Sequence, residues 1–530
     1  MIIYLIINKR YDIIIKNHNS KAVNDSMKKY EWMKNDIPAI MFSAVDSRKT
    51  SRLFRLSVIF KNEEVDPERL KEAVRLVVQR CPLYMHRNAK GFFWTYLEKS
   101  DTLPPVLPEE YRPAQLRRLG NDGAPEIVFL YYKRRLSFET SHVLGDGTGM
   151  IELLKSVVAE YMILGGADRN EFENIRLSDT PVSETEMENA YLRYKTDEDL
   201  PKLKRDKSYV LPYTYDKNYQ NHISGLVKIS DAKACCSEYG ISVTEFLAAG
   251  VILAMIRTAG KPITETIVLD IPVNLRNMFP SDTVRNFAST IPLQFNPQGK
   301  TDYTFGDIAN AIKGQLKANN TRENHQAFIN SNCSLTEKKI LQIVPYFIKK
   351  PVLSVMQKKS HTTEMTLILS NVGNTVLPKI MSDHIERLEV ISGDSRVYNM
   401  PMFFYIMALN GYMNLVFGLS GKDRKLCREF FRIMTSMGVG VRIESSLENG
   451  IEENTKIGPK VCNKCNVRLG EEYSRCPLCD GKASETDVPD EYFKTALFPQ
   501  PYKEFKHSKF RKKKFGISKE KLKAYFLLKP

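Results

Sequence analysis

The residues best suited to catalysis lie in the string SHVLGDG at 141–147, which has the form H-x-x-x-D-G. The imidazole of His142 ionises near neutral pH, so it is suited to accept a proton from an attacking hydroxyl, amine or thiol. Asp146 is better suited to organise the loop by pairing with an arginine than to act on a substrate. Gly145 and Gly147 predict a sharp turn with space beside the imidazole. Taken alone, such a short pattern is more often structural than catalytic.

A second group of residues has the spacing of a metal site. Cys462 and Cys465 form one C-x-x-C pair, and Cys476 and Cys479 form another ten residues later. Two such pairs can surround zinc with four thiolates, which leaves no position for water and predicts a structural site. The alternative is a pair of redox dithiols, but the spacing and Gly470 favour a zinc ribbon. The remaining cysteines have apolar neighbours and are expected to be buried thiols.

The segments around the histidine have the pattern of an α/β fold. Residues 136–142 alternate like a strand, and apolar residues at helical spacing follow over 150–161. Asp66-Pro67 predicts the start of a helix that ends before Pro82. In the second half, the capping box at 242–245 predicts another helix.

Further strands are expected in both halves, with a helix near the end of the second. Asn410-Gly411 lies between two apolar runs and predicts a hairpin over 402–420. The whole pattern indicates two α/β halves of comparable size. The strands are expected at 53–60, 92–96, 127–132, 266–275, 287–295 and 366–372, and the helix at 423–437.

At 530 residues, the chain is long enough for two or three domains. Met27 and Met33 precede the first globular pattern, so the true start can lie at either of them. The expected organisation is an N-terminal extension over 1–36, a first lobe with the H-x-x-x-D-G string over 37–190, a crossover linker over 191–220, a second lobe over 221–445, a zinc ribbon over 446–490 and a basic tail over 491–530.

With these segments in view, the chain resembles the coenzyme A-dependent acyltransferase superfamily, which includes chloramphenicol acetyltransferase, condensation domains and alcohol acetyltransferases. Four features occur in the family's order: the helix over 65–82, the H-x-x-x-D-G string, the segment DIPVNLR at 270–276, which is similar to the alcohol acetyltransferase branch, and SNVG at 370–373. The resemblance covers residues 40–443. It implies two chloramphenicol acetyltransferase-like lobes that form a pseudo-dimeric V with a central tunnel.

The resemblance also implies roles for individual residues. His142 is the expected general base, with Asp146 and Gly147 completing the catalytic motif. Arg276 is the expected partner of Asp146, although it could instead end a strand in water. The remaining residues implied as structural or oxyanion support are Asn286, Ser370 and Asn371; the alternative role of Ser370 is to satisfy a turn with Asn371.

The implied reaction transfers an acyl group, with acetyl-CoA as the expected donor, to an alcohol that could be a lipid, a glycan or a small molecule. Ser141 stands where condensation domains carry a second histidine, and the chain has no carrier-protein site, so free acyl-CoA is favoured. The alternatives are N-acylation or condensation of an amine, and a catalytically silent binding protein.

The charge of the chain indicates possible binding partners, and its cysteines indicate the cellular compartment. The net charge of +16 comes largely from the tail, where aromatic residues alternate with lysines. Such a tail suits an anionic membrane or nucleic acid, although solvated disorder is the simpler interpretation. No segment has the length of a membrane span. Free cysteines suit a reducing compartment, so a cytoplasmic location is expected. The protein is also expected to be a monomer.

Overall fold

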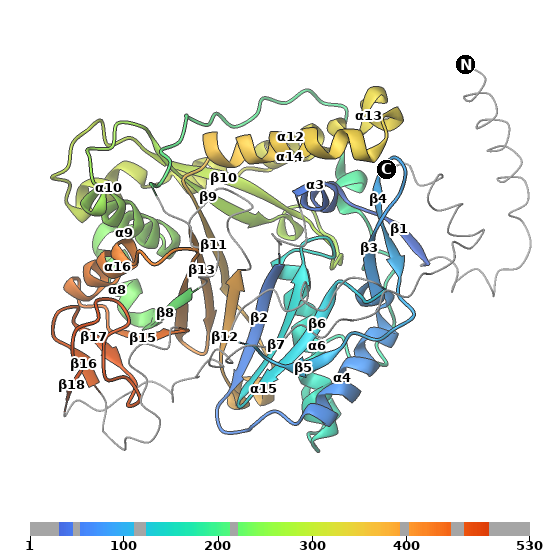
Figure 1. The fold of residues 1–530 in the computed structure, drawn as a ribbon, viewed down its shortest axis with the longest axis horizontal. Coiled ribbons are helices and arrows are strands. Elements are labelled where there is room, and N and C mark those ends of the chain that lie inside the picture. The colour runs from blue at the N-terminus through green and yellow to red at the C-terminus, as the bar shows by residue number, and fades with distance from the viewer. Residues whose placement is uncertain are drawn as a thin grey trace, which may run out of the picture.

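The computed structural model describes residues 31–45, 53–110, 123–212, 221–392, 402–446 and 460–486. Most of the expected N-terminal extension and the whole basic tail lie outside these residues. The described chain forms two α/β lobes side by side (Figure 1), and a small four-cysteine unit follows the second. The fold class expected from the sequence is therefore confirmed.

The first lobe is built on a five-stranded sheet in the order β12-β2-β7-β6-β5. Apolar side chains from α4 and α6 join those of the sheet in a single core. The elements are β2 (Leu53–Phe60), α4 (Pro67–Arg80), β5 (Val106–Pro108), β6 (Ile127–Tyr132), β7 (Arg135–Ser141), α6 (Gly147–Leu164) and β12 (Ile385–Ser392).

Local sequence explains the ends of these elements. The side chain of Asp66 accepts hydrogen bonds from the backbone amides of Glu68 and Arg69, and Pro67 occupies the first helical position of α4. The strands β2, β6 and β7 match their predicted ranges closely. The strand predicted at 92–96 lies slightly later, at β4 (Thr95–Lys99), because residues 91–94 form the turn after β3 (His86–Lys90).

The first lobe includes residues that the sequence assigned to the N-terminal extension. Trp32–Lys34 form β1, which pairs antiparallel with β4 in a three-stranded sheet. The buried side chain of Asp36 then accepts a hydrogen bond from the amide of Ala39 at the start of α3 (Ile37–Val45). The fold therefore begins before the expected boundary at residue 37.

The second lobe is built on a ten-stranded sheet in the order β10-β9-β11-β13-β14-β8-β15-β17-β16-β18. Helices α9 and α16 contribute apolar side chains to its core. Its main elements up to residue 436 are β8 (Asn221–Lys228), α8 (Ile229–Tyr239), α9 (Val243–Thr258), β9 (Ile267–Asn274), β10 (Ala288–Phe295), β11 (Leu367–Asn374), β13 (Met402–Leu409), β14 (Tyr412–Leu419) and α16 (Lys425–Ser436).

Two local predictions in this lobe are confirmed. Ser242 and Glu245 form the reciprocal capping box that begins α9. Asn410 and Gly411 both have positive φ, 53° and 81°, and join β13 to β14 in a two-residue hairpin turn. The sheet ends in β15 (Val441–Ser445), β16 (Lys460–Cys462), β17 (Val467–Leu469) and β18 (Ser484–Glu485).

The two lobes exchange elements. β12 follows β11 in the chain, yet it pairs antiparallel with β2 in the sheet of the first lobe. The buried side chain of Arg387 on β12 forms ion pairs with Glu386 and with Glu444 on β15. Residues 385–392 therefore complete the first lobe, although the sequence assigned them to the second.

Further helices fill the remaining connections, and α12 and α14 lie at the top of the view, where they run from above β10 toward α3 (Figure 1). The linker is not a bare crossover, because it contains α7 and because Ser208 forms a bridge with Thr266. These helices are α7 (Ala190–Tyr194), α10 (Phe305–Ile312), α11 (Gln315–Asn319), α12 (Arg322–Glu337), α13 (Lys339–Ile343), α14 (Tyr346–Thr363) and α15 (Lys379–His384), with 3-10 turns η1 (Pro82–Met85), η2 (Arg169–Glu171) and η3 (Leu275–Asn277).

Among the described residues, no single helix has the length and apolarity needed to cross a membrane. Only α8 and α9 taken together meet that test, and the pair is bent by 83°.

Candidate functional site

His142 lies at the point where β7 ends and the loop to α6 begins. Its imidazole lies near two aromatic rings. Phe42 on α3 stacks at a centroid distance of 4.8 Å, and Phe54 on β2 lies at 4.4 Å. Phe54 is adjacent because β2 pairs with β7, with Leu53 opposite Ser141. The histidine is half-buried, and its orientation depends on packing from two other elements.

Asp146 is fully engaged within the protein. Its carboxylate accepts hydrogen bonds from the amide of Gly149 at 2.8 Å and from the amide of Phe287 at 2.7 Å. The first of these bonds caps the N-terminus of α6. The second connects the loop to the segment before β10. The side chain therefore holds the loop in place, as the sequence predicted.

Arg276 is the partner of Asp146. Its two terminal nitrogens contact the two carboxylate oxygens at 3.0 and 3.2 Å, which is a bidentate ion pair. The pair is mostly buried, so the alternative of an arginine that ends a strand in water is wrong. The guanidinium also donates to four other oxygens, those of Asn274, Thr283, Arg285 and Phe287.

The glycines of the loop act through close packing. Neither Gly145 nor Gly147 has positive φ, so the predicted sharp turn does not depend on left-handed backbone. A Cβ at Gly145 would lie 2.4 Å from the carbonyl oxygen of Val284, and one at Gly149 only 2.0 Å from it. A Cβ at Gly147 would have no heavy atom of another residue within 4 Å, apart from its chain neighbours and its own helix backbone. Gly145 and Gly149 therefore allow residue 284 to pack against α6.

Gly149→Ala is expected to destabilise the protein by about 1–3 kcal/mol, because the added methyl group would overlap the backbone at residue 284. Gly147→Ala is the matched control, since its methyl group would enter open space, and it should melt like the wild type. Thermal melting of the two variants measures the difference. Equal melting temperatures would contradict the packing role of Gly149.

Asn286 supports the histidine from the second lobe. Its side-chain amide donates to the backbone carbonyl of His142 at 2.8 Å and to the carboxylate of Asp36 at 3.0 and 3.2 Å. Burial raises the pKa of Asp36, while the guanidinium of Arg285, 3.5 Å away, opposes that shift. Asn286 thus occupies the supporting position expected of it.

Three residues beside the histidine carry no sequence signal for that position, namely Asp36, Phe42 and Phe54. Asp36 fell in the segment treated as an extension, and the two phenylalanines have the ordinary pattern of core residues. The Asp36-Ile37-Pro38 run, an N-cap type residue shortly before a proline, was the one available signal for a helix start.

Ser370 and Asn371 lie on β11 and not in the loop that carries His142. β11 pairs with β9 at Leu367 and Ile368. From Leu369 to Asn371 it pairs in parallel with β13. The side-chain amide nitrogen of Asn371 donates to the hydroxyl of Thr244 at 2.9 Å. The side-chain oxygen of Asn371 accepts a hydrogen bond from the backbone amide of Gly373. Asn371 therefore stabilises the turn at Gly373 through its own side chain, and the predicted turn role of Ser370 stays a prediction. The predicted oxyanion role of Ser370 stays a prediction.

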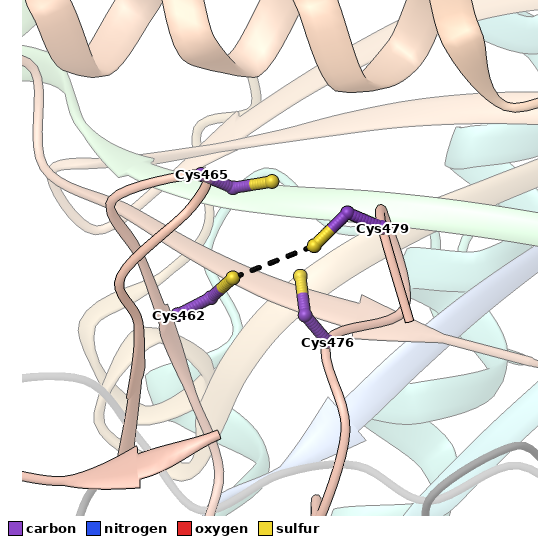
Figure 2. Close-up of side chains that lie close together, drawn as sticks. All are labelled: Cys462, Cys465, Cys476 and Cys479. Atoms are coloured by element: carbon purple, nitrogen blue, oxygen red, sulfur yellow. Dashed lines mark hydrogen bonds between the residues drawn. The ribbon is translucent and has the colours of Figure 1, made fainter. Parts of the chain in front are cut away.

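The four clustered cysteines converge on one point. Their sulfurs turn toward a common centre (Figure 2) and all lie within 4.8 Å of one another, with 3.6 Å between Cys462 and Cys479. A tetrahedral zinc ion with Zn–S bonds of about 2.3 Å separates its sulfurs by about 3.8 Å. A hydrogen bond from Cys476 and the nearby charge of Arg432 lower the pKa of Cys465, which favours its thiolate form. The donor set and its size therefore fit zinc.

The four-cysteine unit is continuous with the second lobe. Its strand β17 pairs in parallel with β15, and Cys462, Cys465 and Cys476 belong to the core of the second lobe. The hydroxyl of Tyr473 accepts a hydrogen bond from the amide of Ser445 at 3.0 Å. The ribbon expected as an appended module is thus an extension of the second sheet.

No family model matches the chain, and no relative is found among curated proteins. Similar solved structures include TRI3 trichothecene 15-O-acetyltransferase from Fusarium sporotrichioides, with 11% identity, a TM-score of 0.49, and coverage of 77% of this chain and 94% of that one. Another is F. sporotrichioides TRI101 complexed with coenzyme A and T-2, with 12% identity, a TM-score of 0.48, and coverage of 77% and 99%.

A third similar structure is the starter condensation domain of rhizomide synthetase RzmA in complex with C8-CoA. It shares 10% identity at a TM-score of 0.46, and the match covers 79% of this chain and 96% of that one. All three TM-scores are below 0.5. The assignment of chemistry to this chain therefore depends on the residues that surround His142.

Proposed function

We propose that the protein is an acyl-CoA-dependent acyltransferase in which His142 is the general base. The observation that carries the proposal is the division of roles within the H-x-x-x-D-G loop. The carboxylate of Asp146 is occupied by Arg276 and by two backbone amides. The imidazole of His142 is instead oriented by aromatic rings and is partly exposed.

In the proposed reaction, the imidazole of His142 accepts the proton of the acceptor hydroxyl as its oxygen attacks the thioester carbonyl. A C–O bond forms and the C–S bond then breaks. The proton moves from the imidazolium to the departing sulfur, which leaves as coenzyme A. No protein nucleophile is acylated. Ser370 is the proposed donor to the oxyanion that develops during the attack.

We further propose acetyl-CoA as the donor and an alcohol as the acceptor. The support is the similarity of residues 270–276 to the alcohol acetyltransferase branch, together with the ion pair that Arg276 of this segment forms. An amine acceptor would use the same base and differs only in the attacking atom. The silent-binding alternative is disfavoured, because a decayed site need not keep the loop, its capping residue and its arginine partner assembled.

The proposal is tested by release of free thiol from acetyl-CoA in the presence of panels of alcohols and amines. Thiol release with an alcohol, and its loss in His142→Ala, is the expected result. Activity confined to amines would replace O-acylation by N-acylation. The absence of turnover with both panels and with longer acyl-CoA donors, in protein that binds coenzyme A, would favour the silent-binding alternative.

We also propose that the four cysteines hold a structural zinc ion. All four ligands are sulfur, so the site would have no open position for a substrate. Thiolate ligands persist in a reducing compartment, which agrees with a cytoplasmic location.

A further inference from the structure

Helices α13 and α14 carry an apolar surface that faces solvent among the described residues. Phe347 is 70% exposed and Val355 is 65% exposed, although such side chains are usually buried. They belong to one set of large apolar residues on these two helices, which we call the α13–α14 face. It consists of Ile340, Ile343, Phe347, Ile348, Val352, Val355 and Met356.

The opposite side of α14 is firmly attached to the protein. Tyr346, Lys349 and Leu353 are buried at helical spacing. The ammonium of Lys349 lies 3.3 Å from the ring centroid of Trp94 in the first lobe, a cation–π contact. The helix therefore already has a packed inner face, and the apolar residues on its outer side are additional to the core.

The charges on this segment are all of one sign. Residues 338–363 contain six lysines and no aspartate or glutamate. Lys338, Lys339 and Lys359 are exposed beside the apolar residues. A helical surface that combines exposed apolar side chains with lysines is typical of segments that lie in the interface of an anionic membrane. A second copy of the same face would bring lysines against lysines, which disfavours self-association.

The face is also close to the candidate active site. α14 packs on α3, and α3 carries Phe42, which stacks on the imidazole of His142. Any partner bound to α14 would therefore be separated from the reacting groups only by α3.

We propose that the α13–α14 face binds the surface of an anionic lipid bilayer, with its apolar side chains in the acyl boundary and its lysines against lipid phosphates. The proposal is based on the exposed apolar residues and lysines of α13 and α14, and it does not depend on the reaction proposed for His142. The basic tail could add to binding, but the α13–α14 face is the part that enters the apolar layer.

The first test is co-flotation of the full-length protein with vesicles of phosphatidylcholine, alone or mixed with phosphatidylglycerol. The wild type should bind the mixed vesicles and bind more weakly as salt increases. The double variant Phe347→Ser with Val355→Ser should bind about tenfold more weakly, because it removes two insertable side chains. Val376→Ser is the matched control, since Val376 is 76% exposed outside the face, and it should bind like the wild type.

A second test locates the contact. Val355→Trp places a fluorophore on the face, and its emission should be quenched by vesicles that contain brominated phosphatidylcholine. The same substitution at Val376 should not be quenched. Each fluorescence signal is corrected for Trp32 and Trp94 with the wild type.

Four outcomes would overturn the proposal. The first is unchanged flotation of the double serine variant, which would assign binding to another part such as the tail. The second is equal binding to vesicles without phosphatidylglycerol. The third is a wild-type dimer that the double variant converts to a monomer, which would make a second copy the occupant. The fourth is vesicle binding that appears only after deletion of residues 1–30, which would make that segment the occupant.

Discussion

His142→Ala should lower the turnover of acetyl transfer by about a hundred- to ten-thousand-fold, the usual contribution of a general base. The loss should appear in kcat, with the KM for the acyl donor little changed. The fold should survive, because the imidazole is only half-buried and the aromatic rings of Phe42 and Phe54 remain. Thiol release and thermal melting measure the two effects separately.

The matched variant is Asp146→Ala, which should lose both activity and stability. It removes the carboxylate that caps α6 and accepts from Arg276 and the amide of Phe287. Removal of one member of a buried pair leaves the other charge without a partner, which typically costs about 3–5 kcal/mol. The melting temperature should therefore fall in this variant and not in His142→Ala.

The central proposal fails if folded His142→Ala protein turns over like the wild type with an acceptor that the wild type uses. The structural role of Asp146 fails if Asp146→Ala melts like the wild type.

Removal of the metal site should unfold part of the second lobe. Structural zinc in small cysteine sites contributes about 10 kcal/mol or more of folding free energy. β17 pairs with β15, and three of the cysteines lie in the core of the second lobe. Unfolding of the four-cysteine unit should therefore extend into the sheet of the second lobe. The double variant Cys462→Ser with Cys476→Ser should therefore lose zinc and melt well below the wild type.

Metal analysis should find about one zinc per chain in the wild type. Hydrogen exchange should then show loss of protection in β15 of the double variant. Cys235→Ser is the matched control, because Cys235 is buried in the same lobe but outside the cluster, and it should keep the metal. Wild-type protein purified under reducing conditions without zinc would contradict the site. Unchanged protection of β15 would instead mean that the unit folds independently.

The sequence by itself determined the elements whose signals are local. Asp66-Pro67 marked the start of α4, the capping box marked α9, and Asn410-Gly411 marked the β13–β14 hairpin. Each signal depends on residues a few positions apart, so backbone geometry and capping decide it without tertiary contacts. The loop with His142 and the four-cysteine spacing were recognisable for the same reason.

Only the tertiary structure decided what surrounds these motifs. Asp36 and Asn286 are separated by 250 positions, yet their side chains share hydrogen bonds beside His142. β12 crossed into the sheet of the first lobe, and β17 extended the sheet of the second. Such contacts follow from how whole sheets and helices pack, and spacing along the chain does not encode which distant faces meet. For that reason the local motifs were predictable, whereas the residues that orient them were not.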